Sequence, residues 1–305
     1  MGKVIGMDIG GTNLRVGYVD ESGNVLYHKV VPSRTITEGG DAVRDLIGFL
    51  KGYVEECGEA PEAMAIGIPA VICDDEKTVF QAPNLKDPSG KMLLDKTNLA
   101  DPISEAFGVP VWIVRDTYCL LYADRERLGL QNEKIIAAGY IGTGYGGGVM
   151  IDGKILFGKG GLAMDFGHFT LHPDGKLCRC GKKGCLEAYA SGIALQDLRE
   201  EYFPDTEIGD MFTKHRDDPI LKQFVRDCAL PMSILGTILS PDVYLLGDGV
   251  VEMNDFPMED LLEAIKDQAG HGAVDAGMRF VISPKDSSKG VFGAGIYARE
   301  HLARM

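Results

Sequence analysis

Apolar and polar residues alternate along the chain with two periodicities, one typical of strands and one typical of helices. Five early segments are rich in apolar residues and end in glycine, proline or polar turns, which predicts strands. They are KVIGMDIGG (3–11), NLRVGYVD (13–20), VLYHKVVP (25–32), AMAIGIPA (63–70) and VPVWIVRD (109–116). Helical spacing of the apolar residues predicts helices over 39–57 and 117–130.

The second part of the chain repeats the opening pattern. Residues 135–156 give strand, glycine-rich turn, strand, turn and strand in the same order as residues 5–26. Such self-similarity is typical of a duplicated unit. Later helices are predicted near 192–203, 218–239, 258–270 and 290–304, and strands at 243–249 and 279–283. The alternation predicts an α/β fold, and the duplication predicts two lobes with a cleft between them.

The composition is that of a soluble and acidic globular protein. The 305 residues are 45% hydrophobic, and 31 Lys and Arg against 45 Asp and Glu give a net charge of −14. This charge disfavours nucleic acid and anionic membranes as partners, but it is compatible with a neutral substrate such as a sugar. No signal peptide and no apolar run near the roughly 18 to 20 residues of a membrane span is present, so we expect a cytoplasmic protein.

Two glycine turns at matching places of the repeat are candidates for phosphate binding. They are DIGGT (8–12) and IGTG (141–144). Glycines allow a close backbone approach, and exposed N–H groups can cradle phosphate. A hairpin without a ligand would look the same, but two matching copies favour a pair of turns that grip a nucleotide. Asp8 would then hold Mg²⁺ through water, because Mg²⁺ keeps several of its waters.

Asp116 is the candidate for orienting a phosphoryl acceptor. It lies where the predicted strand 109–115 ends and the predicted helix begins. In α/β sheets, ligands sit at the carboxyl ends of strands, and phosphoryl transfer needs a group that orients the acceptor hydroxyl. A plain helix-capping role is the alternative, since Asp is common at that position.

These motifs together resemble the ROK family of sugar kinases and sugar-responsive repressors. The resemblance rests on DIGGTN near the start, GTG at 142–144, and Gly-His followed by CRCGKKGCLE (178–187), and it covers essentially the whole chain. It implies an actin-like ATPase fold with two ribonuclease H-like lobes and a homodimer. The lobes would be 1–116, joined by the returning helix 290–305, and 117–289.

The resemblance also implies a role for each matching residue. Asp116 falls on the catalytic base. ATP and Mg²⁺ would be held by Asp8, Gly10, Gly11, Thr12, Asn13, Gly142, Thr143, Gly144, Gly247 and Gly249. The sugar would be held by Asn84, Arg115, Asp116, Asp165, His168 and Glu187. A structural Zn²⁺ would be held by His168, Cys178, Cys180 and Cys185.

The Cys/His block also indicates zinc by its spacing. His168 is followed at +10, +12 and +17 by three cysteines, and four N/S ligands suit a closed tetrahedral Zn²⁺ site. A Cys-x-Cys disulfide is strained and would be reduced in the cytosol, and the Cys-x-x-Cys redox spacing is absent. Free core thiols and a redox role are the alternatives. Zinc would fix His168 and thereby position Asp165 and Glu187, whose other interpretation is that of solvated surface acids.

Three positions depart from the usual family pattern. Arg115 stands where Asn is usual, Asp165 where Glu is usual, and Asp248 where a middle glycine is usual. The Arg115-Asp116 pair and the stretches 68–85 and 249–261 resemble the bacterial D-allose kinases. The predicted function is therefore ATP- and Mg²⁺-dependent phosphorylation of a hexose, D-allose first, at its 6-hydroxyl.

Three other functions are weighed against this prediction. Glucokinase, fructokinase and N-acetylmannosamine kinase belong to the same family. A sugar-sensing repressor is disfavoured, because such proteins carry a helix-turn-helix before the DIGGT segment and here Asp8 comes almost at once. A non-catalytic actin-like module is disfavoured because it needs neither a His/Cys₃ site nor a catalytic Asp.

Overall fold

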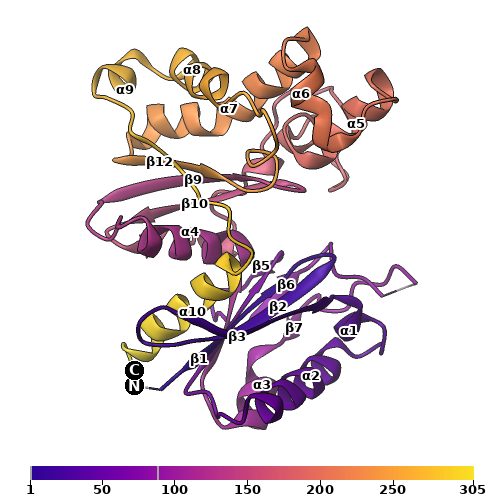
Figure 1. The fold of residues 1–305 in the computed structure, drawn as a ribbon, viewed down its shortest axis with the longest axis vertical. Helices are drawn as coiled ribbons and strands as arrows, with labels where there is room; N and C mark the ends of the chain where they lie inside the picture. Colours follow the sequence, from indigo (N-terminus) through magenta and orange to yellow (C-terminus); the bar gives the residue numbers. More distant parts are fainter. Residues whose placement is uncertain (1, 88) are drawn as a thin grey trace. The chain divides into compact units, whose positions relative to one another are not determined.

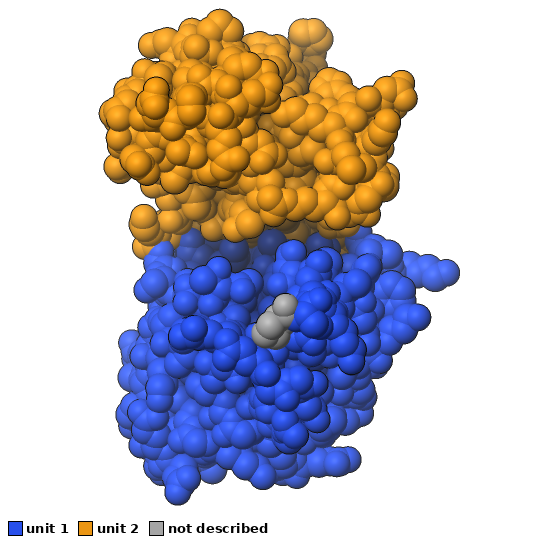
Figure 2. Space-filling view, turned by 90° about the vertical axis from the view of Figure 1, so that its right-hand side faces the viewer, with its two compact units in different colours: residues 1–130, 157–162, 286–305 blue, residues 131–156, 163–285 orange. Residues whose placement is uncertain are grey.

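Two sheets with the same strand order organise the chain. The structure is a computed structural model that describes residues 2–87 and 89–305. It divides into two compact units, shown in separate colours in Figure 2. Unit 1 comprises Met1–Leu130, Phe157–Leu162 and Asp286–Met305, and unit 2 comprises Gln131–Leu156 and Ala163–Lys285.

The sheet of unit 1 has the order β3-β2-β1-β4-β8. Its strands are β1 (Val4–Ile9), β2 (Asn13–Val19), β3 (Val25–Pro32), β4 (Met64–Ile68) and β8 (Val111–Arg115). The first three are antiparallel neighbours, while β1, β4 and β8 run parallel. The carboxyl ends of β1, β4 and β8 therefore meet at one edge of the sheet.

Helices cover both faces of this sheet. They are α1 (Arg34–Thr37), α2 (Ala42–Cys57), α3 (Ala100–Phe107), α4 (Asp116–Arg127) and α10 (Lys289–Leu302), beside a small sheet of β5 (Val71–Ile72), β6 (Thr78–Gln81) and β7 (Thr97–Asn98). Side chains alternate across β1, so Ile5 and Met7 pack in the core that includes Leu46 and Leu50 of α2, which lies beside α3 (Figure 1). Gly6 faces α10, where a methyl group would collide with the Val291 carbonyl.

The sheet of unit 2 has the order β11-β10-β9-β12-β13, with the same sequence of antiparallel and parallel neighbours. Its strands are β9 (Ile135–Ile141), β10 (Tyr145–Ile151), β11 (Lys154–Ile155), β12 (Val243–Gly247) and β13 (Phe280–Ile282). Its helices are α5 (Gly192–Tyr202), α6 (Met211–His215), α7 (Pro219–Leu239), α8 (Met258–Gln268) and α9 (His271–Asp275). Short 3₁₀ turns lie at Phe166–His168, Leu186–Ala188 and Ile208–Asp210, and another at Lys159–Gly161 of unit 1.

The predicted strands and long helices are present, with ends shifted by a few residues. Unit 1 extends through α4 to Leu130, and α4 packs against α10. Helix α10 itself is part of unit 1. Over the described ranges, none of the helices combines the length and the apolar character that crossing a membrane would require.

Candidate active site

The glycine turn of unit 1 (Gly10–Thr12) is held by hydrogen bonds on one side and is open at Gly11 on the other. Gly10 N–H donates to the Asn13 carbonyl at 2.9 Å. Ser33, directly after β3, donates its N–H to the Thr12 carbonyl at 2.9 Å and its hydroxyl to the Gly10 carbonyl at 2.6 Å. A methyl group added at Gly11 would meet nothing within 4 Å. The turn therefore has a defined shape and an exposed outer face, as a phosphate-binding turn requires.

Asp8 lies at the base of this turn. Its Oδ2 is 3.5 Å from Nη1 of Arg15, the residue opposite it on β2. Its side chain is only 18% exposed. The first turn of α10 packs on it, since a methyl group at Gly290 would lie 2.6 Å from Cγ of Asp8. The carboxylate is thus held in place by the fold while part of it stays accessible.

Asp116 follows β8 directly and is the first residue of α4. Its Oδ1 accepts a hydrogen bond from the Thr117 N–H at 2.8 Å, and the residue is half-buried. Gly67 on β4 leaves room beneath it, since a methyl group there would lie 2.8 Å from Cys119 Sγ and 3.7 Å from Cα of Asp116. The capping alternative is not met, because Arg115 occupies the N-cap position of α4 and the Asp116 side chain binds only the N–H of the residue that follows it.

Asp8 and Asp116 both act on the buried thiol of Cys119. Burial raises the pKa of Cys119, and the negative charges of Asp8 and Asp116 raise it further. The two residues lie at neighbouring strand ends, since Asp8 is paired with Gly67 of β4 and a methyl group at Gly67 would lie 3.7 Å from Cα of Asp116; α/β proteins bind ligands at this edge of the sheet. Cys119 stays a neutral thiol and contributes packing rather than a nucleophile.

Arg115 and Asn84 are the other predicted sugar-binding residues of unit 1. The Arg115 guanidinium lies 5.6 Å from the centre of the Tyr118 ring, and its Nη1 is 3.5 Å from the Gly161 carbonyl oxygen. Asn84 is exposed in a turn after β6, which the Leu85 N–H closes on the Ala82 carbonyl at 3.1 Å. Arg115 is thus adjacent to Asp116 in sequence and anchored at its head group.

The glycine turn of unit 2 is fixed by a helix instead of a serine. Gly142 N–H donates to the Gly144 carbonyl at 3.0 Å within the turn. The first two N–H groups of α5, those of Gly192 and Ile193, donate to the carbonyls of Gly142 and Thr143 at 2.8 and 3.1 Å. The amino-terminal end of α5 therefore faces this turn, and its dipole favours anions there.

The four predicted zinc ligands come together in unit 2. A ring nitrogen of His168 and the Sγ atoms of Cys178, Cys180 and Cys185 all lie within 4.8 Å of one another. His168 Nδ1 to Cys178 Sγ is 3.8 Å, and Cys180 Sγ to Cys185 Sγ is 3.6 Å. Ligands of a tetrahedral zinc with bonds of about 2.3 Å lie about 3.8 Å apart, so the donor set and its spacing fit Zn²⁺.

The loop that carries these cysteines is braced by its own backbone. Cys178 N–H donates to the Lys182 carbonyl at 2.8 Å, and Gly181 N–H donates to the Cys178 carbonyl at 2.9 Å. Gly181 has φ +89°, a left-handed conformation that favours glycine. The cysteines are free thiols, with sulfur separations too long for a disulfide of about 2.05 Å.

The predicted sugar-binding groups of unit 2 surround this block. Asp165 lies one 3₁₀ turn before His168, whose N–H donates to the Asp165 carbonyl at 3.0 Å. Glu187 Oε2 would be 3.1 Å from a methyl group at Gly167 and would collide with one at Gly144. The structure therefore brings Glu187 next to both the His168 turn and the glycine turn.

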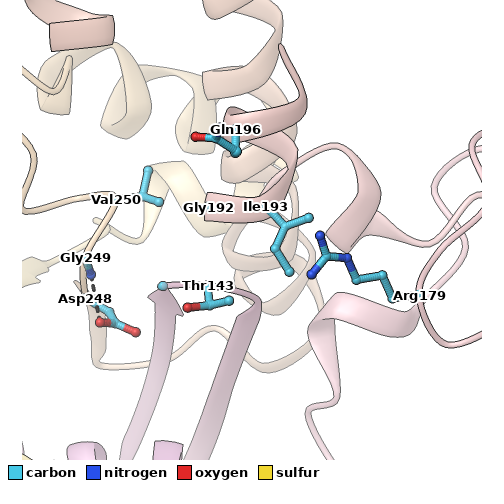
Figure 3. Close-up of a pocket in the computed structure, with 9 residues that line it drawn as sticks. Thr143, Arg179, Gly192, Ile193, Gln196, Asp248, Gly249 and Val250 are labelled. Atoms are coloured by element: carbon cyan, nitrogen blue, oxygen red, sulfur yellow. Dashed lines mark hydrogen bonds between the residues drawn. The ribbon is translucent and has the colours of Figure 1, made fainter. Parts of the chain in front are cut away.

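A cavity of about 430 Å³ opens beside the Gly142–Thr143 turn (Figure 3). It is lined by Gly142, Thr143, Arg179, Gly192, Ile193, Gln196, Asp248, Gly249 and Val250. Gly247 is buried beneath it, where a methyl group would lie 2.5 Å from Cβ of Ser283. Sequence reasoning assigned no role to Arg179 or Gln196; the only sequence signal for Arg179 is its place between two cysteines.

Comparison with known proteins places both units in one family. The profile of the ROK family matches residues 4–301. The glucokinase of Streptomyces coelicolor is 27% identical over 328 residues, which cover 98% of each chain. An N-acetylmannosamine kinase of Yersinia pestis is 30% identical over 195 residues, 64% of this chain and 63% of that one.

A solved structure gives the same result. The ROK family glucokinase of Streptomyces griseus, in complex with glucose and AMPPNP, superposes with a TM-score of 0.80 at 27% identity. The match covers 98% of this chain and 100% of that chain. The predicted actin-like ATPase fold is thereby confirmed.

Proposed function

The chain belongs to the ROK family, and on that premise we propose that it phosphorylates a hexose, preferentially D-allose, at its 6-hydroxyl. The broader assignment is an ATP-dependent sugar kinase, in keeping with glucokinase relatives along the whole chain. The observation that carries the proposal is the placement of Asp8 and Asp116 at neighbouring strand ends of unit 1, beside an open glycine turn.

Asp116 accepts the proton of the reacting hydroxyl in this proposal. A carboxylate with an ordinary pKa near 3.9 is too weak a base to deprotonate an alcohol in advance. Asp116 therefore orients the hydroxyl by accepting its hydrogen bond. It takes the proton late, as the sugar oxygen bonds to the γ-phosphorus and ADP leaves with the electrons of the broken P–O bond.

The glycine turns would hold the phosphates. Gly11, Thr12 and Asn13 offer backbone N–H groups and a hydroxyl from unit 1, and Thr143 and Gly144 offer the same groups from unit 2, while Gly10 and Gly142 shape the turns because their N–H groups bond within them. Bound Mg²⁺ would neutralise phosphate charge, with Asp8 as its protein carboxylate acting through water.

The acids of unit 2 would hold the sugar. His168 presents Nδ1 to the thiolates, which leaves Nε2 for a sugar hydroxyl, and bound zinc would fix that ring orientation. Glu187 and Asp165 each offer carboxylate oxygens to hydroxyl donors. Zinc in this role is a structural clamp that preorganises the sugar-binding groups.

Arg115 supports D-allose as the preferred acceptor. Allose differs from glucose only in the direction of its 3-hydroxyl, so selectivity needs a differently placed polar group. Arg115 replaces an amide with a longer, charged donor directly before Asp116, as the resemblance to D-allose kinases implies. Glucose, fructose and N-acetylmannosamine are the competing substrates.

A coupled ADP-release assay with ATP and Mg²⁺ tests the proposal. The acceptors are D-allose, D-glucose, D-mannose, D-fructose and N-acetylmannosamine. We expect the highest kcat/KM with D-allose, and a shift of the allose-to-glucose ratio of about tenfold or more in Arg115→Asn. An unchanged ratio in that variant would reject the role of Arg115, and higher turnover of another hexose would reject D-allose.

A further inference from the structure

The cavity of unit 2 carries opposite charges at its two ends. Asp248 lies at one end and Arg179 at the other, with the Gly142–Thr143 turn between them (Figure 3). Ile193 and Val250 give the wall between the charges an apolar surface. A volume of about 430 Å³ falls within the range of small-ligand sites.

Asp248 is held in a strained position against the glycine turn. Its φ is +77°, a left-handed conformation that a glycine would adopt more easily. Its Oδ1 accepts the Gly249 N–H at 2.7 Å. Its Oδ2 lies so close to Gly142 that a methyl group there would collide with it. One carboxylate oxygen is thus anchored to the backbone, and the carboxylate borders the cavity.

Arg179 reaches the cavity from the cysteine loop. Its neighbours Cys178 and Cys180 belong to the candidate zinc site, so the loop that carries it is braced on both sides. The guanidinium is directed toward Ile193, at the amino-terminal end of α5 (Figure 3). A cation on a braced loop loses little freedom when it binds an anion, which strengthens the interaction.

We propose that Asp248 binds the ribose of the nucleotide and Arg179 its phosphates, and that together they fix the direction of the nucleotide in the cavity. Asp248 accepts hydrogen bonds from the ribose hydroxyls, while Arg179 pairs with phosphate oxygens. The base is joined to the ribose and lies against Val250, at the Asp248 end of the cavity. This inference rests on the proposed nucleotide-dependent function and extends it to residues that the motifs leave unassigned.

The chemistry of the two ends supports this direction. A carboxylate accepts hydrogen bonds well but repels phosphate, so the Asp248 end suits a neutral polyol. A guanidinium presents a planar set of donors that matches phosphate oxygens. The reverse placement would bring phosphate against Asp248 and leave Arg179 facing neutral hydroxyls.

Nucleotide binding to the whole 305-residue chain, purified with bound zinc, tests the Asp248 end. Isothermal titration with Mg²⁺ measures Kd for ATP, 2′-deoxy-ATP and 3′-deoxy-ATP. We expect wild type to bind one or both deoxy analogues about tenfold more weakly than ATP, because a hydrogen bond to a charged group is lost. Asp248→Asn should reduce that ratio to about twofold or less. Asp152→Asn is the control, since Asp152 is an exposed acid with φ +49° in the β10–β11 turn.

Phosphate-dependent affinity tests the Arg179 end. Arg179→Gln should weaken ATP and ADP about tenfold and leave adenosine unchanged, and it should flatten the salt dependence of ATP binding. Arg226→Gln, an exposed residue of α7, is the matched control. Zinc content is measured in every variant, because Arg179 lies between two candidate ligands.

The outcomes separate this inference from the proposed function. If the wild type phosphorylates sugar but binds ATP and both deoxy analogues with equal Kd, the proposal that Asp248 binds the ribose hydroxyls would be overturned. Asp248→Asn binding every nucleotide more tightly by one factor would also overturn it, since Asp248 would then only repel charge. If Arg179→Gln weakens the binding of adenosine as much as that of ATP, the proposal that Arg179 binds the phosphates would be overturned. Absence of nucleotide binding and of turnover in wild type would instead reject the kinase proposal itself.

Discussion

The two glycine turns occupy matching places in two matching sheets, yet their surroundings differ. In unit 1 the turn after β1 is pinned by Ser33, and the space in front of Gly11 is open. In unit 2 the turn after β9 is pinned by the first N–H groups of α5. Acids crowd it, because Asp248 lies against Gly142 and Glu187 lies against Gly144.

The strands that lead into the turns differ as well. Asp8 lies two residues before the first turn glycine in unit 1, opposite Arg15. The matching residue of unit 2 is the buried Tyr140, opposite Gly146. The duplicated sheet thus supplies two similar scaffolds. In the proposed function, the metal-binding and proton-accepting acids belong to unit 1 and the hydroxyl-binding acids to unit 2.

The largest expected difference between the units is at Asp116. Asp116→Asn removes the proton acceptor but keeps the shape of the side chain. We expect kcat to fall by about 10³-fold, within the range of lost general-base catalysis, with sugar Kd changed by less than about threefold. The coupled assay gives kcat, and isothermal titration gives the sugar Kd.

Asp101→Asn is the matched control for Asp116→Asn. Asp101 also lies in the first turn of a unit 1 helix, α3, where it is paired with Lys77. It should retain wild-type turnover. If Asp116→Asn kept more than about a tenth of wild-type kcat, the assignment of proton transfer to unit 1 would be wrong.

The next largest effect concerns the metal block of unit 2. Cys185 is fully buried, so Cys185→Ser should abolish bound zinc and lower the free energy of unfolding by roughly 3 to 5 kcal/mol. Elemental analysis measures zinc, and urea unfolding measures stability. Hydrogen exchange should show the loosening concentrated in 165–187.

Cys57→Ser on α2 of unit 1 is the control for the cysteine prediction. Cys57 is half-buried and lies outside the ligand set, so zinc content should stay at wild-type level. A wild-type chain that holds no zinc, with equal unfolding curves for both variants, would favour the free-thiol alternative.

Local sequence signals predicted most of the scaffold. The alternation in β1, where Ile5 and Met7 face the core, is visible in the sequence alone. The clustering of His168 with three cysteines was also predictable, because His and Cys in that spacing are typical of one metal site; bound zinc stays a prediction. Short elements such as α3 and β5 were missed, since a few residues carry too little periodicity.

The cavity beside the glycine turn of unit 2 could not be predicted from the sequence, for another reason. Arg179 and Asp248 are 69 positions apart in the chain. They line one cavity only because the cysteine loop and the turn after β12 pack around the start of α5. Such a juxtaposition depends on tertiary packing, so only the unusual acid at 248 was noticeable from the sequence.

A pair of alanine substitutions tests the contrast between the turns. Neither Gly11 nor Gly144 has a φ in the left-handed range, so alanine is tolerated by the backbone at both places. Gly144→Ala should displace Glu187 and raise the sugar Kd about tenfold. Gly11→Ala should leave the sugar Kd unchanged and weaken ATP, because its methyl group points into the open front of the turn. Equal effects of both variants on sugar and on ATP would mean that the turns share one role.

The smallest expected effect is the acid response of unit 1. Glu76 Oε2 lies 3.0 Å from His301 Nε2 on α10. Burial alone would raise the pKa of Glu76, but the hydrogen bond and the charge of His301 outweigh burial and hold the pKa below its ordinary value of 4.5. A lowered folded pKa means that the carboxylate stabilises the fold fully above pH 4.5, and that this contribution is lost as the pH falls through the folded value.

Trp112 makes this response measurable in unit 1 alone. It is the single tryptophan of the chain, and its ring centre lies 5.3 Å from that of His301. Urea midpoints followed by Trp112 fluorescence should fall between about pH 5 and pH 3, and Glu76→Gln should show a smaller fall. Glu105→Gln, an exposed residue of α3, should behave as wild type. Identical pH profiles for Glu76→Gln and wild type would show that the acid response of unit 1 comes from other carboxylates than the one that holds α10.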